Sequence, residues 1–413
     1  MTITERKVAI TGLGVVSPIG SGKNNYWRAL EAGTNGVGPI TAFDASEFPV
    51  RIAAEVKDFN PEDYMPRKEA KRADRAIQFA VAASQMAMDD AGLAAGSVDP
   101  YRFGVYIGSG QGGISTCFEN FQTLITAGHR RVSPFFIPMM ITNMAAAYVA
   151  IQQKAKGPCF CVVTACATGV NNIGEAARAI SRGDADVMLA GGTEAAVCSI
   201  CVAGFAAMKA LSTRNDEPGR ASRPFDRDRD GFVVGEGAGV LVLEDMERAR
   251  ARGAHIYGEI RGYGSSCDAS HITAPDPNGE GAARAMQMAV EEAGWDRVDL
   301  INAHGTSTGL NDVMESQAIN RVFGAAAPDI LVNSTKSMIG HGLGAAGGME
   351  TVAAIQSLEE GIIHRTLNLE NQDPECNVTV VKETLRRPVD RVLVNSFGFG
   401  GHNAVIAIEK CRS

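Results

Sequence analysis

A single cysteine lies where an apolar segment gives way to a helical pattern. The stretch "VVTACATGVNNIGEAARAI", residues 162–180, has Cys166 near its start. The apolar run 160–163 predicts a buried strand, and apolar residues then recur at helical spacing from Val170 onward. A thiol at the N-terminus of a helix meets unpaired N–H groups and the positive end of the helix dipole, which favour the thiolate and could hold an oxyanion. The pattern predicts a nucleophile, although a buried unreactive thiol would fit this stretch equally well.

Two histidines stand beside glycines at the ends of predicted elements. His304 in "NAHGTSTG" follows an apolar strand run, and His341 in "STKSMIGHGLGAAGG" precedes a helix rich in small residues, with Lys336 five residues before it. A lone histidine among apolar residues is usually a packed core residue, but two in such positions are harder to explain that way. A thioester exchange needs a thiolate, and two imidazole N–H donors can stabilise a negative oxygen without a metal. The set therefore suits a Claisen condensation better than proteolysis, which would use a Cys–His–Asn arrangement.

The elements that would position these residues occur twice along the chain. "QMAMDDAGL" at 85–93 reappears as "QMAVEEAGW" at 287–295, and each is followed by an apolar run, "FGVYIGSGQGG" and "LINAHGTSTG". "ADVMLAGG" at 185–192 has a counterpart in "VDRVLVNSFGFGG" at 389–401. Three matches in the same order predict a duplicated α/β unit. The strand runs are continuously apolar, which is typical of sheets covered on both faces by helices.

Expected helices lie between these strands, at 73–90, 171–181, 281–292 and 347–358, whereas the polar segment 212–230 predicts a long loop. Two such halves packed together would give a layered α/β/α body with sites where the halves meet.

Composition narrows the class of protein. The chain has 413 residues, 45% of them hydrophobic and 21% charged, which is ordinary for a globular protein with a large core. The net charge of −8 argues against non-specific nucleic-acid binding. The first twenty residues show no long apolar segment of a secretory signal, and no stretch is long enough to span a membrane, so we expect a cytoplasmic protein. Nine cysteines without framework spacing fit a reducing compartment.

Four cysteines and two motifs suggest other sites, but each is incomplete. We expect buried structural thiols at four positions that could suggest half a metal site: Cys159, Cys161, Cys198 and Cys201. "GSGQGG" at 108–113 follows a strand but lacks the second strand and acidic residue of a dinucleotide site. "DRDRDGFVVGEG" at 226–237 resembles a calcium loop but has glycine where the bidentate glutamate belongs. We therefore predict a tight glycine turn at 108–113 and a turn held by salt bridges at 226–237.

Several of these motifs together resemble one family. "TACATG", "NAHGTSTG", "STKSMIGHGLGAAGG", "NSFGFGGHN" and "SRPFDRDRDGFVVGEGAGVLVLE" closely resemble the β-ketoacyl-[acyl-carrier-protein] synthases, the condensing enzymes of the thiolase fold. The likeness runs nearly end to end and is greatest to the type II elongating synthases. It implies an α/β fold with thiolase-like α-β-α-β-α layers. Residues 1–255 would form an N-terminal half with Cys166, and residues 256–413 a C-terminal half with His304 and His341.

The resemblance also implies residue roles. Cys166 would carry the acyl chain as a thioester, His304 and His341 would bind the malonyl thioester and stabilise its enolate, and Lys336 would set the electrostatics of the histidines. The N–H groups of Cys166 and Phe399 would form the oxyanion hole, and Phe399 would gate the pocket. Glu350 would support the site from behind. Substrate would be bound by Thr306, Thr308, Gln111, Phe136, Phe205 and Phe397. Basic residues cluster in "MPRKEAKRADR" and at 130–131, so we expect the acidic carrier protein to dock on Arg67, Lys68, Lys71, Arg72, Arg130, Arg131 and Lys209. A solvated helix face is the alternative interpretation of the first cluster.

The resemblance implies no metal and no bound cofactor, because phosphopantetheine arrives on the acyl carrier protein. A homodimer is expected, or a heterodimer with a chain-length partner. Gln111 stands where elongating synthases often have an apolar residue. His364 and Arg365 stand where the family typically has two prolines. These departures leave a polyketide or polyene ketosynthase as an alternative function. A non-catalytic chain-length subunit would usually lack the cysteine at 166. A biosynthetic thiolase would need a second active-site cysteine near the C-terminus, where this chain has His402.

Overall fold

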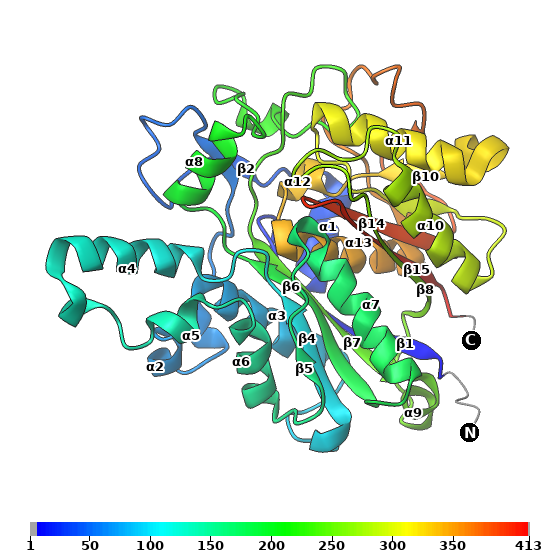
Figure 1. Ribbon diagram of the computed structural model, residues 1–413. Helices are drawn as coiled ribbons and strands as arrows, with labels where there is room; N and C mark the ends of the chain where they lie inside the picture. Colours follow the sequence, from blue (N-terminus) through cyan, green and yellow to red (C-terminus); the bar gives the residue numbers. More distant parts are fainter. Residues whose placement is uncertain (1–5, 412–413) are drawn as a thin grey trace.

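Eleven strands form one mixed sheet in the computed structural model, which describes residues 6–411 (Figure 1). In chain order these strands are β1 (Val8–Val16), β4 (Phe103–Gly108), β5 (Cys159–Phe160), β6 (Val187–Glu194), β7 (Gly237–Asp245), β8 (Gly258–Cys267), β9 (Leu300–Asn302), β10 (Leu331–Asn333), β12 (Thr379–Val380), β14 (Arg391–Gly398) and β15 (His402–Glu409). Two small sheets pair β2 (Val37–Pro39) with β3 (Ile52–Ala54) and β11 (Ile362–Ile363) with β13 (Leu385–Arg386).

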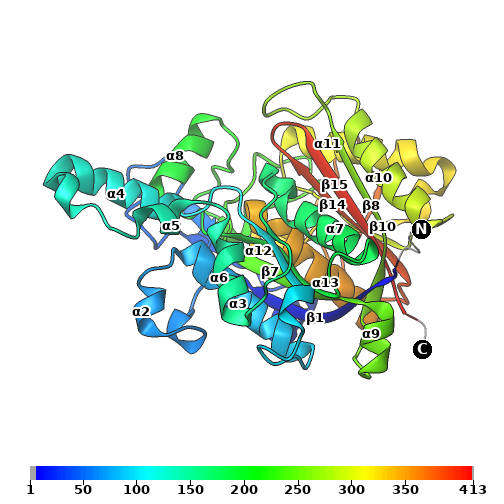
Figure 2. The same cartoon turned by 60° about the horizontal axis from the view of Figure 1, so that its bottom comes forward.

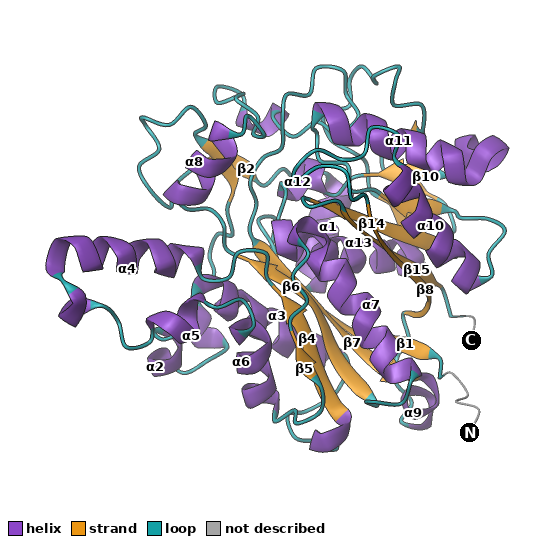
Figure 3. Ribbon diagram, viewed as in Figure 1, coloured by secondary structure: helices purple, strands orange, loops and turns teal. Residues whose placement is uncertain are grey.

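Helices lie on both faces of the large sheet (Figure 3). They are α1 (Lys23–Ala32), α2 (Arg67–Ala70), α3 (Arg75–Asp90), α4 (Ile114–Ala127), α5 (Phe136–Met140), α6 (Met144–Gln153), α7 (Thr168–Ser181), α8 (Ser199–Ala207), α9 (Met246–Ala251), α10 (Glu280–Ala293), α11 (Gly309–Phe323), α12 (Lys336–Ile339) and α13 (Ala346–Glu360). The four helices expected between strands correspond to α3, α7, α10 and α13, with boundaries that differ by a few residues. None of the helices in the described part of the chain is long and apolar enough to cross a membrane.

The strand order repeats on either side of the centre of the sheet. The order is β12-β10-β9-β14-β15-β8-β1-β7-β6-β4-β5, and β1 joins β8 through antiparallel pairing of Val8–Ile10 with residues 258–260. Outward from that junction, β1-β7-β6-β4-β5 on one side matches β8-β15-β14-β9-β10 on the other. The repeated sequence motifs therefore occupy equivalent places in the two halves of the sheet. The domain boundary between residues 255 and 256 falls between α9 and β8, and it stays a prediction.

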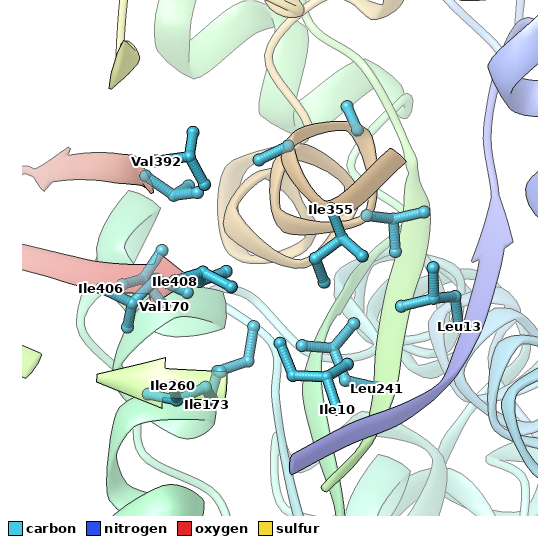
Figure 4. Packing of buried hydrophobic residues seen from close by; sticks show 14 of the residues in the cluster. Ile10, Leu13, Val170, Ile173, Leu241, Ile260, Ile355, Val392, Ile406 and Ile408 are labelled. Carbon is cyan, nitrogen blue, oxygen red and sulfur yellow. The ribbon is translucent and has the colours of Figure 1, made fainter. Parts of the chain in front are cut away.

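Two helices form the middle layer of the molecule. α7 packs on β6 and β15, while α13 packs on β7 and β14, so both are enclosed between the two halves of the sheet (Figure 2). The outer layers are α3 with α6 on one side and α10 with α11 on the other. Ile173 of α7 and Ile355 of α13 belong to one apolar cluster with side chains from both halves (Figure 4). This confirms the predicted thiolase-like α-β-α-β-α fold.

The two middle helices approach each other closely where the active residues are held. A Cβ on Gly169 of α7 would lie 2.8 Å from the backbone nitrogen of Gly348 in α13, which is too close for any side chain. Glycine at this point lets the first turns of both helices meet. The residues that precede these turns, including Cys166 and His341, are therefore brought to the same place.

The strand expected just before Cys166 differs from the prediction. β5 covers only Cys159–Phe160, and 161–163 is loop. Among residues 6–411, β5 pairs with β4 alone and forms the edge of the sheet. Its side chains are therefore exposed in the single chain, and the exposed fraction of Phe160 is 59%. The prediction of four buried thiols was wrong for Cys159, which is exposed, and for the half-buried Cys161 and Cys198, whereas Cys201 is buried.

Candidate active site

Cys166, His304 and His341 meet in the interior although they are far apart in sequence. Cys166 lies in a single 3-10 turn, η4 (Ala165–Ala167), immediately before α7, while His304 follows β9 and His341 follows α12. All three side chains are nearly inaccessible, and the thiol sulfur and one nitrogen from each ring lie within 4.8 Å of one another. Ala165 has φ of 49°, a left-handed conformation that is uncommon outside glycine and shapes the turn that presents the sulfur.

His341 is the histidine in contact with the nucleophile. Its Nε2 lies 3.0 Å from Cys166 Sγ. The backbone N–H of Leu343 donates to Nδ1 of the same ring at 3.3 Å. Because Nδ1 is then the acceptor, the proton of the neutral ring resides on Nε2 and points at the sulfur. His341 thus acts as a hydrogen-bond donor toward the reacting centre.

His304 has the same tautomer for a different reason. The Lys336 ammonium, fully buried behind the two rings, donates to His304 Nδ1 at 3.4 Å and also pairs with the buried carboxylate of Glu350. The His304 ring stands at 84° to the His341 ring with centroids 5.4 Å apart. Nε2–H groups from both rings are therefore available in the space around the sulfur.

Burial and the lysine charge keep both rings neutral. Desolvation lowers the pKa of His304 and of His341 well below the usual value, and the nearby Lys336 cation lowers both further. A neutral imidazole donates one hydrogen bond without adding a charge to the site. The pair can therefore stabilise developing negative charge on an oxygen.

The resting state of Cys166 is a thiol, contrary to the thiolate expected from its position. Burial raises the pKa of Cys166 to about 12, which outweighs the lowering effects of Lys336 and of two backbone N–H groups. The sequence shows the helix N-terminus but not the depth at which the sulfur is buried. The proton must therefore leave Cys166 in the course of the reaction.

This protonation state predicts how Cys166 reacts with iodoacetamide. The rate at Cys166 should rise about tenfold per pH unit from about pH 7 to about pH 10, because the thiolate fraction grows by that factor below the pKa. Peptide mass spectrometry that separates Cys166 from Cys159 and Cys161 measures the rate. A plateau near neutral pH would show a preformed thiolate and contradict the prediction.

Two backbone N–H groups lie near the sulfur. The N–H groups of Phe399 and of Cys166 itself lower the pKa of Cys166, so they stabilise negative charge on the sulfur. The approach of β14 to η4 depends on Gly398, since a Cβ at that position would lie 2.7 Å from the Thr164 carbonyl oxygen and 3.0 Å from the Cys166 nitrogen. These donors are placed to hold an oxyanion formed on a carbonyl attached to the sulfur.

A cavity of about 550 Å³ contains the site and extends to the surface. Besides the three central residues, its lining includes most of the predicted substrate-binding and gating residues: Gln111, Phe205, Thr306, Thr308, Phe397 and Phe399. Phe136 is not among the residues that line this cavity; it lies half-buried on α5. Lys336 and Glu350 lie behind the histidines rather than on the cavity surface.

Two buried carboxylates were not singled out from the sequence. Glu194, at the end of β6, lines the cavity and accepts hydrogen bonds from Ser109 and from the backbone N–H groups of Gly110, Gln111 and Gly344. Glu315 of α11 accepts from the N–H groups that begin the His304 loop. Burial raises the pKa of each to about 7. Glu194 could have been noticed in the sequence, because it is an acidic residue at the end of a continuously apolar strand run.

The basic residues predicted to dock a carrier protein fall in separate places. Arg67, Lys68 and Lys71 are exposed on and after α2, and Arg130 with Arg131 are exposed in the turn after α4. Lys209 lines the cavity and follows α8, which lies well apart from α2 (Figure 1). Arg72 differs from the rest, because its guanidinium stacks over the Phe135 ring at 4.3 Å and is only half-exposed.

The three central side chains are also of the types that bind zinc. A cation there would lie close to the Lys336 ammonium and would have to displace the N–H protons assigned above. That the site works without a metal stays a prediction.

Comparison with known proteins agrees with this geometry. Residues 5–249 match the model "Beta-ketoacyl synthase, N-terminal domain" and residues 257–370 match "Beta-ketoacyl synthase, C-terminal domain". The chain belongs to the β-ketoacyl synthase family. This β-ketoacyl synthase is 51% identical to 3-oxoacyl-[acyl-carrier-protein] synthase 2 of Synechocystis sp., with 99% of both chains covered. It is 49% identical to the protein of the same name from Coxiella burnetii, over 98% of this chain and 99% of the relative.

Solved structures give the same result. A β-ketoacyl synthase from Burkholderia phymatum is 38% identical with a TM-score of 0.91, covering 98% of this chain and all of the other. The ishigamide ketosynthase/chain length factor is 37% identical with a TM-score of 0.91, covering 99% of this chain and all of the other.

Proposed function

We propose that this β-ketoacyl synthase catalyses the decarboxylating condensation of an acyl chain with malonyl-[acyl-carrier-protein], giving 3-oxoacyl-[acyl-carrier-protein] and CO2. The observation that carries the proposal is the pair of Nε2–H donors, from His304 and His341, beside a buried thiol with two backbone N–H groups in one cavity. A nucleophile for the acyl group and neutral donors for an enolate are what this reaction needs.

Acyl transfer to Cys166 comes first. The sulfur attacks the thioester carbonyl of the incoming chain, and the carbonyl oxygen takes the negative charge between the N–H groups of Cys166 and Phe399. The pantetheine sulfur leaves, and the proton of Cys166 goes to it. The exchange of one thioester for another leaves the net charge unchanged. A thiol with a raised pKa can therefore act as the nucleophile, provided that its proton leaves as the new carbon–sulfur bond forms.

Condensation follows in the same place. Malonyl thioester binds with its carbonyl oxygen at the two Nε2–H donors. Loss of CO2 leaves an enolate whose charge His304 and His341 stabilise, and its carbon attacks the acyl-cysteine. The tetrahedral intermediate expels the Cys166 thiolate, which takes up one proton and returns to the resting thiol. Lys336 supports the step by holding His304 in its donor tautomer and by its positive charge.

The phosphopantetheine arm reaches the site as part of the carrier protein, so the reaction requires no resident cofactor. Thr306 and Thr308, whose hydroxyls lie 2.9 Å apart, line the cavity and are suited to contact the amides of the arm. Phe399 is half-buried next to Gly398 and would move to admit the acyl chain.

Fatty acid elongation is favoured over polyketide synthesis. Identity to relatives named 3-oxoacyl-[acyl-carrier-protein] synthase 2 reaches 51%, whereas identity to the type II polyketide ketosynthase AntDE is 35%. The test is to incubate the protein with an acyl carrier thioester and malonyl-[acyl-carrier-protein] and to weigh the carrier-bound product. A product longer by two carbons with a 3-oxo group is expected. Absence of any product with acyl chains of several lengths would refute the proposal.

Binding of an acidic carrier protein should depend on the basic residues around α2. The overall charge of −8 opposes association, so a local positive patch would have to overcome it. Lys68→Glu with Lys71→Glu should raise KM for carrier-protein substrates about tenfold and leave KM for small pantetheine thioesters unchanged. Lys71 is preferred to Arg72 here, because Arg72 packs on Phe135. Lys382→Glu at another exposed position is the control, and an equal loss on both substrate types would mean that the patch is structural.

The edge strand β5 supports a homodimer. β5 pairs only with β4, and exposed apolar side chains surround this edge, including Ile151 at 75%, Phe160 at 59% and Val163 at 43%. Exposed edges of this kind are normally covered. A second copy that adds its own β5 would extend the sheet. Phe160→Asp should shift the mass in solution, measured by light scattering, from dimer to monomer. Ile272→Asp, at a still more exposed apolar residue elsewhere, should leave the mass unchanged.

A further inference from the structure

A pair of thiols next to the active-site cavity is not used by the proposed reaction. Cys198 is the residue that caps the N-terminus of α8, in extended conformation, and Cys201 lies in the first turn of this nine-residue helix. The Cys201 thiol and backbone N–H lie close enough to the Cys198 sulfur to lower its pKa. Neither is in a disulfide. Two cysteines separated by two residues at a helix N-terminus have the spacing of redox-active dithiols.

The two thiols differ in environment as the members of such a pair do. Cys198 is half-buried and Cys201 is only 8% exposed. Interactions with Cys201 and with Ser115 of α4 lower the pKa of Cys198 to about 6, whereas the neighbouring Cys198, followed by burial, raises the pKa of Cys201. Cys198 is therefore suited to attack, and Cys201 to resolve the product.

The pair is linked to the cavity through Gln111. The Cys201 thiol donates a hydrogen bond to the Gln111 side-chain oxygen. Gln111 lines the cavity together with Cys166. The Gln111 side chain therefore has a hydrogen-bond partner within its own chain. Loss of the thiol hydrogen would release the Gln111 side chain.

We propose that Cys198 and Cys201 form a reversible disulfide with a small-molecule disulfide as oxidant, and that this oxidation changes the acyl-chain preference of the cavity through Gln111. The Cys198 thiolate attacks one sulfur of the oxidant, whose S–S bond breaks and releases one thiolate. Cys201 then loses its proton and attacks the Cys198 sulfur, releasing the second thiolate. The protons of the two cysteines pass to the two leaving thiolates, so one oxidant molecule is reduced to two thiols while two cysteines become one disulfide.

The test of the disulfide uses the full chain with Cys166→Ala, so that the catalytic thiol does not react. Glutathione disulfide is added over a range of ratios to glutathione, and free thiols are then alkylated. Trypsin cuts after Arg182 and Lys209, which puts Cys198 and Cys201 alone in one peptide. We expect this peptide to lose the mass of two hydrogens and to resist alkylation, and reductant to reverse both changes.

Single variants show whether both thiols are needed. Cys198→Ser keeps a capping oxygen at the helix N-terminus and should remain unoxidised. Cys201→Ser should stop at a glutathione adduct on Cys198. Cys267→Ser, which removes an exposed thiol on β8, should leave oxidation of the pair unchanged. A pair that still alkylates twice at every ratio, or a wild-type pair that accumulates only the glutathione adduct, would overturn the proposal.

The effect on substrate choice rests on the proposed condensing activity, whereas formation of the disulfide does not. With Cys166 present and shown to be free after oxidation, kcat/KM for long relative to short acyl chains should change about threefold to tenfold, the size set by one hydrogen bond. Gln111→Ala should remove this response. A disulfide that forms without any change in chain preference would overturn the link through Gln111, and failure of condensation in the reduced enzyme would instead refute the proposed function.

Discussion

Replacing Cys166 by alanine is expected to abolish condensation while some malonyl decarboxylation persists. The variant has no sulfur to carry the acyl chain, so neither acyl labelling nor 3-oxoacyl product should be detected. The Nε2–H donors of His304 and His341 remain, together with the lysine that fixes one of them. They can still stabilise an enolate formed from malonyl thioester. Release of CO2 from labelled malonyl-[acyl-carrier-protein] measures the residual step.

The histidine variants should show the reverse pattern. In His304→Ala or His341→Ala the thiol and its two backbone N–H partners remain, so acylation of Cys166 should survive at least in part. Decarboxylation should fall by about 10²–10³-fold, as expected for one lost oxyanion donor. The tautomers inferred for the two rings make them donors, which separates this mechanism from one in which a histidine removes the cysteine proton as general base.

Rapid-quench labelling with an acyl carrier thioester, read by intact mass, distinguishes the two mechanisms. His255→Ala, which removes an exposed histidine paired with Glu359, serves as the matched control and should behave as the wild type. A His304→Ala or His341→Ala protein that folds normally but cannot be acylated would refute the division of labour. The contact of His341 with Cys166 at 3.0 Å makes His341 the more demanding test.

Local patterns in the sequence predicted the fold and the central residues well. The apolar runs became β1, β4, β6, β7 and β10 because residues in continuously buried strands must be apolar on both faces. The repeated motifs identified the two equivalent halves. Neighbouring glycines at the ends of elements identified both histidines, His304 after strand β9 and His341 between helices α12 and α13. A histidine next to such a tight turn faces a site rather than packing in a core.

What the sequence could not show depends on contacts between distant segments. The apolar run before Cys166 predicted a buried strand, but β5 lies at the edge of the sheet. Apolar residues are expected both in a buried strand and in an edge strand that is covered by another subunit, so the run does not distinguish the two. The protonation of Cys166 depends on burial by residues from several elements, which no local motif records. The contact of Cys201 with Gln111 joins residues ninety positions apart.

The buried Lys336–Glu350 pair gives the second large expected effect, on stability as well as on catalysis. Both side chains are at most 1% exposed, and Lys336 contacts His304 as well. Lys336→Met would leave Glu350 without its cation, and removing one member of a buried pair costs about 3–5 kcal/mol in the free energy of unfolding. Urea unfolding monitored by circular dichroism should show a loss of this size.

A compensating change separates the structural part of this effect from the catalytic part. In Lys336→Met with Glu350→Gln no charge is buried at the pair, so most of the lost stability should return. Decarboxylation should nevertheless stay low, because nothing then donates to His304 Nδ1 and the ring no longer holds its proton on Nε2 facing the substrate. Acylation of Cys166 should be less affected, since the backbone N–H groups of Cys166 and Phe399 remain in place. If the double variant decarboxylated malonyl thioester at the wild-type rate, Lys336 would serve only to neutralise Glu350, and the donor tautomer of His304 would need another cause.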